Sequence, residues 1–388
     1  MTSVDRWQLP DGIEEVLPEQ AAQVELLRRR LLDQFRAWGY ELVIPPLVEF
    51  TDSLLIGLGQ DLDLRTFKLT DQISGRSMGV RADITPQVAR IDAHSLGREG
   101  VCRLCYAGSI LHTRSNSLMA SRSPIQLGAE LFGDDSLASD VEVIRLMLAT
   151  LALAGVENYT LDLGHVGVYR AVLDAAGLDS ELEARVFDCL QRKSLPDLHN
   201  VLAGVAPEPA ELILGLLNLH GDDDVLSRAR ALFERRAPAA LAAVEALQSV
   251  AQSLRQLQPE LPIYYDLAEL RGYHYHTGLV FAAYVSGHGK ALANGGRYNG
   301  VGEVFGRARP ATGFNTDLKA LMSLTADPAP RPSAIAVPDS ADPALAAAVQ
   351  QLRAQGEIVI HRLPSGSDPR CSRELVEVDG DWRVQPLA

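Results

Sequence analysis

Apolar residues recur along the chain with two spacings, one typical of helices and one typical of strands. Near the N-terminus they recur every three or four positions, which places them on one face of a helix. These residues are Val24, Leu27, Leu31, Phe35 and Trp38. Gly39 follows the last of them and predicts the end of this helix.

The same patterns predict further elements in the body of the chain. Two more helices are expected, at 85–94 and 138–154. Runs of strand-forming residues predict strands at 40–44, 101–107, 125–131, 263–267 and 279–285. Long helices mixed with strands of this kind indicate an α+β protein.

Changes of composition divide the chain into parts. Residues 177–257 are rich in Leu, Ala, Glu and Arg with helical spacing, which predicts a helical insertion. The Pro-rich stretch 327–332 indicates a linker between a body, 1–326, and a small tail, 333–388. In the tail a helical run at 343–354 lies between strand-like segments at 334–337 and 358–361. This order predicts a small α/β domain.

Composition and charge narrow the classes of partner. Among the 388 residues 47% are hydrophobic and 22% charged, and the formal net charge is −14. Such acidity argues against binding to tRNA or another nucleic acid, which usually needs a surface rich in Lys and Arg. No signal peptide and no apolar stretch long enough to cross a bilayer is visible, so we expect a cytoplasmic protein that does not bind membranes.

The four cysteines give little support for a disulfide framework or a metal site. Cys102 and Cys105 form a lone C-x-x-C within a predicted strand, where they point to opposite faces. No second pair stands at ligand spacing. We therefore interpret both as small apolar residues and predict no bound metal.

Polar residues alternate with apolar ones at 125–131. On a strand Gln126, Gly128 and Glu130 share one face. An amide, a gap and a carboxylate in a row suit a ligand that carries an ammonium or an imidazole, and the glycine leaves room for the ligand to approach. The alternative is a half-exposed strand whose polar face meets water.

Further clusters of polar residues and glycine favour a binding site. The segment 271–278 reads RGYHYHTG and the segment 294–298 reads NGGRY, on either side of an apolar strand. Arginine offers a planar fork that fits a carboxylate, and clustered aromatic residues can close over a small ring. The segment 81–85, RADIT, adds an acid and a hydroxyl at the start of a helix.

These segments resemble histidyl-tRNA synthetase, a class II aminoacyl-tRNA synthetase, in order and approximate spacing. The resemblance covers residues 9–324. It is carried by LPDG at 9–12, GYELVIPPL at 39–47, Q-x-G-x-E-x-x-G at 126–133, RGYHYHTG at 271–278 and GGRY at 295–298. It implies an antiparallel sheet flanked by helices, with a dimer interface formed around 39–47.

The resemblance also implies a pocket for histidine. Carried over position by position, three residues face the ligand's ammonium, namely Asp83, Thr85 and Gln126. Glu130 faces the imidazole and Arg271 the carboxylate, and Tyr275 is kept. His274 and His276 replace an aspartate and a tyrosine of the family's signature.

The positions expected to bind ATP are changed. His112 stands in place of a motif 2 arginine and Ala320 in place of a motif 3 arginine, and Asp317 replaces a glycine. Losing one preorganised donor to a reacting group typically costs about 10²–10³ in rate. In the alternative, Lys319 or Arg114 substitutes for a lost arginine.

A synthetase-like body without these arginines, followed by a short tail, resembles the regulatory subunits of ATP phosphoribosyltransferase. That resemblance implies no catalysis of its own and no cofactor. It also implies a hetero-oligomer with the short catalytic subunit, and feedback by L-histidine in the first step of histidine biosynthesis. Two rivals stay open, namely a divergent adenylate-forming aminoacyl ligase and a stand-alone histidine-binding sensor.

Overall fold

The computed structural model divides into two compact units, Met1–Ala326 and Asp327–Ala388. It describes residues 7–55, 60–115, 121–270, 272–273, 275–324, 333–366 and 368–387. The predicted linker at 327–332 lies outside the described residues, as do Arg271 and His274.

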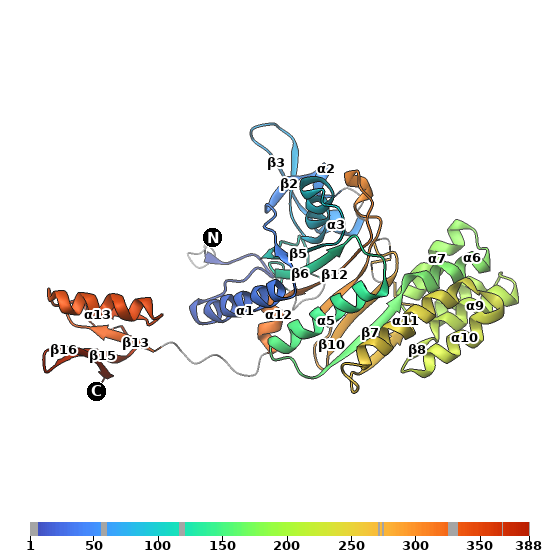
Figure 1. The fold of residues 1–388 in the computed structure, drawn as a ribbon. Coiled ribbons are helices and arrows are strands. Elements are labelled where there is room, and N and C mark those ends of the chain that lie inside the picture. The colour runs from blue at the N-terminus through green and yellow to red at the C-terminus, as the bar shows by residue number, and fades with distance from the viewer. Residues whose placement is uncertain are drawn as a thin grey trace. The chain divides into compact units, whose positions relative to one another are not determined.

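The first unit is built on a nine-stranded, mainly antiparallel sheet (Figure 1). In spatial order its strands are β1 (Glu41–Leu42), β5 (Cys102–Ser109), β6 (Ile125–Phe132), β12 (Ala311–Asp317), β11 (Ala293–Arg297), β10 (Leu279–Val285), β7 (Tyr159–His165), β9 (Ile263–Asp266) and β8 (His220–Gly221). Only the β1–β5 and β7–β9 pairs are parallel. The predicted α+β class is confirmed.

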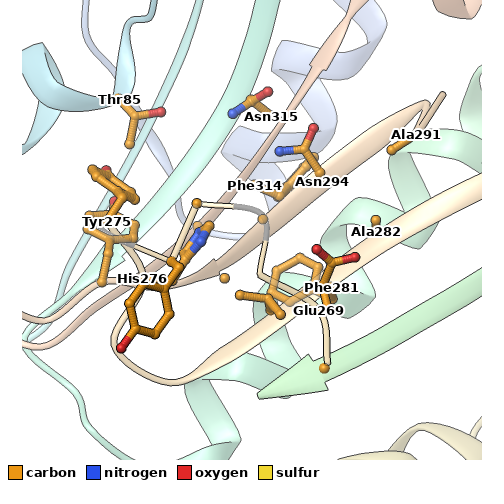
Figure 2. A pocket seen from close by; sticks show the side chains of 18 of the residues that line it. Thr85, Glu269, Tyr275, His276, Phe281, Ala282, Ala291, Asn294, Phe314 and Asn315 are labelled. Carbon is orange, nitrogen blue, oxygen red and sulfur yellow. The ribbon is translucent and has the colours of Figure 1, made fainter. Parts of the chain in front are cut away.

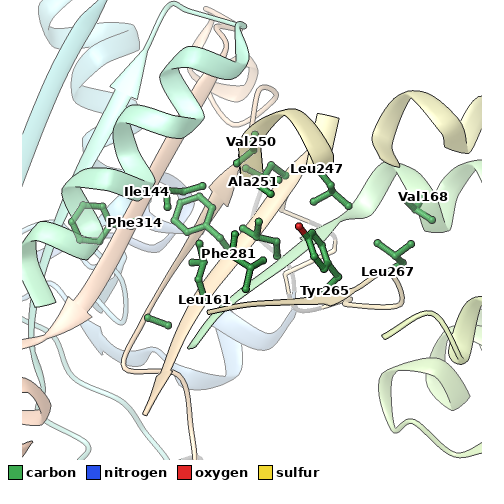
Figure 3. Packing of buried hydrophobic residues seen from close by; sticks show 14 of the residues in the cluster. Ile144, Leu161, Val168, Leu247, Val250, Ala251, Tyr265, Leu267, Phe281 and Phe314 are labelled. Atoms are coloured by element: carbon green, nitrogen blue, oxygen red, sulfur yellow. The ribbon is translucent and has the colours of Figure 1, made fainter. Parts of the chain in front are cut away.

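Helices cover one face of this sheet (Figure 1). They are α1 (Pro18–Ala37), α5 (Leu137–Leu153), α11 (Ala239–Arg255) and α12 (Leu318–Leu324). The predicted apolar face of α1 is confirmed, since Leu27, Leu31 and Phe35 are buried. The Phe35 ring meets the edge of Phe314 on β12 at a centroid distance of 6.0 Å. Phe314 belongs to the continuous core that Figure 3 shows between the helices and the strands.

A smaller layer of structure precedes β5. Strands β2 (Val48–Phe50), β3 (Phe67–Thr70) and β4 (Ser77–Val80) form a three-stranded antiparallel sheet. The short helices here are α2 (Thr51–Leu54), α3 (Gln60–Arg65) and α4 (Thr85–Arg90), and α4 continues as a π-helix, Ile91–Leu96. The strand expected at 40–44 is shorter than predicted, because only Glu41 and Leu42 pair with β5.

A group of helices lies between β7 and β9. It consists of α6 (Val166–Ala176), α7 (Ser180–Gln191), α8 (Leu195–Leu202), α9 (Pro207–Leu217), α10 (Asp224–Arg236) and α11. The sequence pattern predicted neither α6 nor the short strand β8 within this group. The Glu303–Phe305 segment forms a 3-10 turn before β12.

The second unit is a four-stranded sheet with one helix. Its strands, in spatial order, are β14 (Val359–His361), β13 (Ala334–Val337), β15 (Cys371–Val378) and β16 (Asp381–Pro386). The helix α13 (Pro343–Ala354) packs on them through a small core that includes Ile335, Leu345 and Val349. The β15–β16 hairpin was not predicted, although Asp379 and Gly380, both with positive φ, form its turn.

Candidate functional site

A cavity of about 1080 Å³ lies over the central strands of the large sheet. The predicted alternation along β6 is present, since Leu127, Ala129 and Leu131 lie in the main core while Glu130 lines the cavity. Figure 2 shows Thr85 and Tyr275 at one end of the cavity, and Glu269 and Phe281 towards the other.

Glu130 is the buried centre of a hydrogen-bond network. Its side chain is 1% exposed and accepts hydrogen bonds from Tyr106, at 3.0 Å, and from Tyr298. A Cβ on Gly313 would stand 1.6 Å from its Oε2 atom. The strand β12 therefore approaches this carboxyl closely only because residue 313 has no side chain.

Gly128 serves a different purpose from the one predicted. A Cβ there would lie 2.4 Å from the Tyr106 hydroxyl. The space above this glycine is therefore filled by Tyr106, and the expectation that it lets a ligand approach the backbone was wrong. Tyr106 also lies 3.0 Å from the Thr85 hydroxyl, so it joins Thr85 to Glu130.

The environment of Glu130 changes its protonation. Burial raises the pKa of this carboxyl to about 8, although the hydrogen bonds from Tyr298 and Tyr106 act to lower it. The nearby charge of Asp83 contributes to this raised pKa. At neutral pH the empty site therefore holds a largely protonated carboxyl, which can share its proton with a basic ring.

Tyr275 and His276 lie next to each other on the wall of the cavity (Figure 2). The Tyr275 ring stacks on Tyr298 at a centroid distance of 4.9 Å, and its hydroxyl is buried with no hydrogen-bond partner among the described residues. His276 meets the edge of Tyr275 at 5.4 Å. A Cβ on Gly296 would lie 2.7 Å from the His276 ring, so this glycine makes room for it.

The three residues predicted to face an ammonium lie together at the start of α4. The Oδ1 atom of Asp83 accepts hydrogen bonds from the Thr85 backbone N–H and from Nε2 of Gln126, both at 2.9 Å. The Gln126 Oε1 atom accepts from the Ile84 N–H at 2.8 Å. These bonds hold the group rigidly. Asp83 and Thr85 line the larger cavity, whereas Gln126 lines a smaller one that adjoins it.

Arg271, predicted to face the carboxylate, lies outside the described residues. Among the described residues that line the cavity, the arginine and lysine side chains are Arg65 and Lys290. Sequence reasoning missed Arg65, Tyr106 and Tyr298 as site residues. Tyr298 ends the GGRY segment, which was the available signal for it.

The two positions predicted to have lost an ATP-binding arginine, His112 and Ala320, line a second cavity of about 290 Å³. The Nε2 atom of His112 lies 2.9 Å from the Ala82 carbonyl oxygen. The Nη2 atom of Arg65 lies 3.2 Å from Nδ1 of the ring and 3.0 Å from Nε2. Burial and the charge of Arg65 lower the pKa of His112, so the ring is neutral at physiological pH.

Lys290 also lines this cavity, and two further basic residues close to it make contacts within the chain. Arg122 donates to the carbonyl oxygens of His112, at 3.0 Å, and Asp11, at 2.9 Å. Lys319 forms an ion pair of 2.7 Å with Glu14. Neither presents an unengaged charge to a triphosphate, and Arg114 is exposed to solvent.

The parts of the chain that the structure describes contain neither a metal site nor a membrane-spanning helix. No group of three or more His, Cys, Asp or Glu side chains there could hold a metal ion. Within the same residues, no helix is both long and apolar enough to cross a membrane. Cys102 and Cys105 are buried free thiols in two different core clusters, as their predicted opposite faces require.

Two families match successive parts of the chain. Residues 12–321 match the histidyl-tRNA synthetase family. Residues 332–385 match the family described as the ATP phosphoribosyltransferase subunit HisZ C-terminal domain. Together the two matches cover nearly all of the sequence.

Individual relatives agree with this division. The ATP phosphoribosyltransferase regulatory subunit of Pseudomonas fluorescens (strain Pf0-1) is 54% identical, and the alignment covers 100% of both chains. A crystal structure of an ATP phosphoribosyltransferase regulatory subunit/histidyl-tRNA synthetase from Bacillus halodurans C has a TM-score of 0.82 at 26% identity, covering 93% of this chain and 94% of the other.

A more distant structure is similar in fold alone. Histidyl-tRNA synthetase from Nostoc sp. PCC 7120 has a TM-score of 0.76 at 18% identity, over 95% of this chain and 91% of that one. The fold is thus shared with a synthetase of low identity, whereas the full-length match at high identity is to a regulatory subunit. The chain belongs to the family of ATP phosphoribosyltransferase regulatory subunits.

Proposed function

We propose that this chain is the non-catalytic regulatory subunit of an ATP phosphoribosyltransferase that acts in the cytoplasm, in the first step of histidine biosynthesis. It joins the short catalytic subunit in a hetero-oligomer, is required for full activity and conveys feedback by L-histidine. The observation that carries this proposal is the 54% identity over the full length to a regulatory subunit.

The geometry of the smaller cavity supports the absence of catalysis. Forming an adenylate brings a carboxylate and a phosphate together, so positive groups must be aimed at both. Here position 112 is a neutral ring and position 320 a methyl group, and Lys319 is paired with Glu14. Arg65 and Lys290 are the cations that line this cavity, and Arg65 is held against His112.

The larger cavity supports histidine as the effector. Glu130 and the Tyr275 hydroxyl offer a proton and a hydrogen-bond partner to an imidazole at a buried place. Asp83 and Thr85 offer oxygen atoms to an ammonium at the adjoining wall, and Gln126 holds the Asp83 carboxylate in place. Histidine carries both an ammonium and an imidazole, and the pKa of its ring lets the ring share a proton with a carboxyl.

Feedback requires that histidine bind two arrangements of the complex with different affinity. A difference of about 1–3 kcal/mol produces a change of several-fold to about a hundred-fold in activity. The rigid network around Glu130 is suited to such a difference, because small shifts of a packed site cost free energy.

Self-association is a second part of the proposal. The strand β1 lies at the edge of the nine-stranded sheet and pairs only with β5 among the described strands. Leu42, Ile44 and Leu47 beside it are exposed, with Ile44 at 85%. An exposed edge with apolar side chains is suited to an interface with a second copy of the chain.

The test is to titrate purified short catalytic subunit with this chain and to measure formation of the phosphoribosyl product. The rate should rise on addition of the chain and fall again when L-histidine is added. A rate that ignores the added chain would contradict the proposal.

Two further measurements separate the rivals. Histidine-dependent exchange of pyrophosphate into ATP by the chain alone would instead identify an aminoacyl ligase. Histidine binding without any association with the catalytic subunit would identify a stand-alone sensor.

A further inference from the structure

Arg65 lies where the two cavities meet. It ends the helix α3, and it lines both cavities together with Asp83 and Lys290. The two spaces therefore share a wall that carries a guanidinium, an ammonium and a carboxylate.

The shared wall is also where the acid group of an amino acid would come to lie. The ammonium nitrogen and the carboxylate carbon of an α-amino acid are separated by two covalent bonds. A ligand whose ammonium is held at Asp83 therefore brings its carboxylate to within a few ångströms of Asp83. Arg65 and Lys290 are the described basic side chains that line the same wall.

His112 orients Arg65. The Arg65 Nη2 atom lies 3.0 Å from the ring Nε2 atom and 3.2 Å from Nδ1. When Nε2 donates to the Ala82 carbonyl at 2.9 Å, Nδ1 is the ring nitrogen that can accept from Arg65. A protonated ring would repel the guanidinium, and burial keeps the ring neutral. His112 thus holds Arg65 in place, although Arg65 belongs to a helix 47 positions earlier in the chain.

The Arg65 side chain has a donor left over. Its Nε atom is buried and has no hydrogen-bond partner among the described residues. A buried N–H without an acceptor costs free energy, which a ligand oxygen would recover. The Arg65 side chain also lines both cavities, and a guanidinium beside an open space can bind an oxyanion.

We propose that Arg65, oriented by His112 and assisted by Lys290, forms an oxyanion subsite at the junction of the two cavities. Its ligand is either the carboxylate of the amino acid in the larger cavity or a separate small phosphate in the smaller one. The carboxylate assignment rests on the proposed histidine function, whereas the phosphate assignment does not.

The experiment is calorimetry on the full chain, and on its complex with the catalytic subunit, with three probes. These are L-histidine, L-histidinol (which has an alcohol in place of the carboxylate) and inorganic phosphate. If the subsite takes the carboxylate, the wild type should prefer histidine over histidinol at least ten-fold, and Arg65→Gln should abolish this preference. If it takes phosphate, saturable phosphate binding should disappear in Arg65→Gln while the preference for histidine remains.

Other results overturn the subsite. Unchanged preference together with unchanged phosphate binding in a folded Arg65→Gln protein would do so, as would a wild type that neither discriminates histidinol nor binds phosphate. A wild type that binds no histidine, alone or in complex, removes the proposed feedback role. The phosphate measurement would then still decide the fate of the subsite.

Matched variants separate positioning from folding. Arg36→Gln changes a side chain that is 82% exposed on α1, and it should alter neither binding nor thermal unfolding. His112→Phe removes the acceptor for Arg65 and should reduce the preference for the anion. His112→Gln supplies both an acceptor and a donor and should restore it, a rescue that a purely structural role for His112 would not produce.

Discussion

Glu130 is a carboxyl group that the fold has removed from water, and its protonation is coupled to whatever binds beside it. Its pKa is raised to about 8 by burial, while a free imidazole has a pKa of about 6.5. A complex in which the two share one proton neither takes up nor releases protons between these values. At the scale of single residues, these two pKa values should make histidine binding at this site depend on pH.

Histidine affinity should therefore be bell-shaped in pH. Above about pH 8 both groups have lost their protons and the complex must take one up, so affinity falls. Below about pH 6.5 both carry a proton and one must leave, so affinity falls again. Calorimetry between pH 5.5 and 9 measures this, and Glu130→Gln should lose the alkaline decline. A monotonic profile in the wild type would contradict the shared proton.

Tyr275 offers a second test on a single atom. Its buried hydroxyl has no partner among the described residues, so Tyr275→Phe should leave the thermal stability of the free chain unchanged or slightly higher. Histidine affinity should nevertheless fall about 3- to 10-fold, because a hydrogen bond made only in the complex is lost. Thermal unfolding with and without histidine measures both effects. A loss of stability in the free chain would show that the hydroxyl has a structural partner.

At the scale of the elements, the close approach of β6 and β12 depends on a glycine. Gly313→Ala would place a Cβ 1.6 Å from the Glu130 carboxyl, so the strands must separate or the carboxyl must move. We expect a loss of about 1–3 kcal/mol in unfolding free energy, typical of overpacking, and a loss of histidine binding. Gly204→Ala is the control, since nothing lies within 4 Å of a Cβ at that position. Equal effects of both changes on denaturant unfolding would refute this account.

Local patterns predicted the elements well where one face is buried and the other is not. The α1 stripe is of this kind. On β6 both faces are buried, and the alternation instead separates the core face from the face with Glu130, which lines the cavity. The β15–β16 hairpin was missed even though Asp379-Gly380 is a strong turn signal, because the strands beside it carry many charged residues. The sequence patterns predicted the main helices and strands better than the short strands of the two small sheets.

The candidate site was less accessible to sequence reasoning. Arg65 meets His112 across 47 positions of the chain, and no periodicity links the two. Tyr106 looked like one more apolar residue of a strand, and only the packing of β5 beside β6 brings its hydroxyl to Glu130. Alternation along a strand pointed to Glu130 and the resemblance gave it and Asp83 a role, whereas Arg65 and Tyr106 could be found only from the fold.

At the scale of the whole molecule, association depends on surfaces outside the cavities. If the β1 edge joins two copies of the chain, Ile44→Asp should shift the protein towards a smaller species, because a charge replaces an apolar side chain at the interface. Light scattering coupled to gel filtration measures the mass. Leu257→Asp, at an exposed apolar residue distant from β1 in sequence, is the control. An unchanged mass for Ile44→Asp would place the interface elsewhere.

The N-terminal segment has a consequence for any nucleotide that approaches the smaller cavity. The Glu14 carboxylate is held on Lys319 and the Asp11 carbonyl on Arg122, so the chain supplies its own acceptors to cations that a phosphate would seek. A competitor in the same polypeptide cannot diffuse away. A free nucleotide must therefore displace these contacts within the chain before its phosphates can bind Lys319 or Arg122.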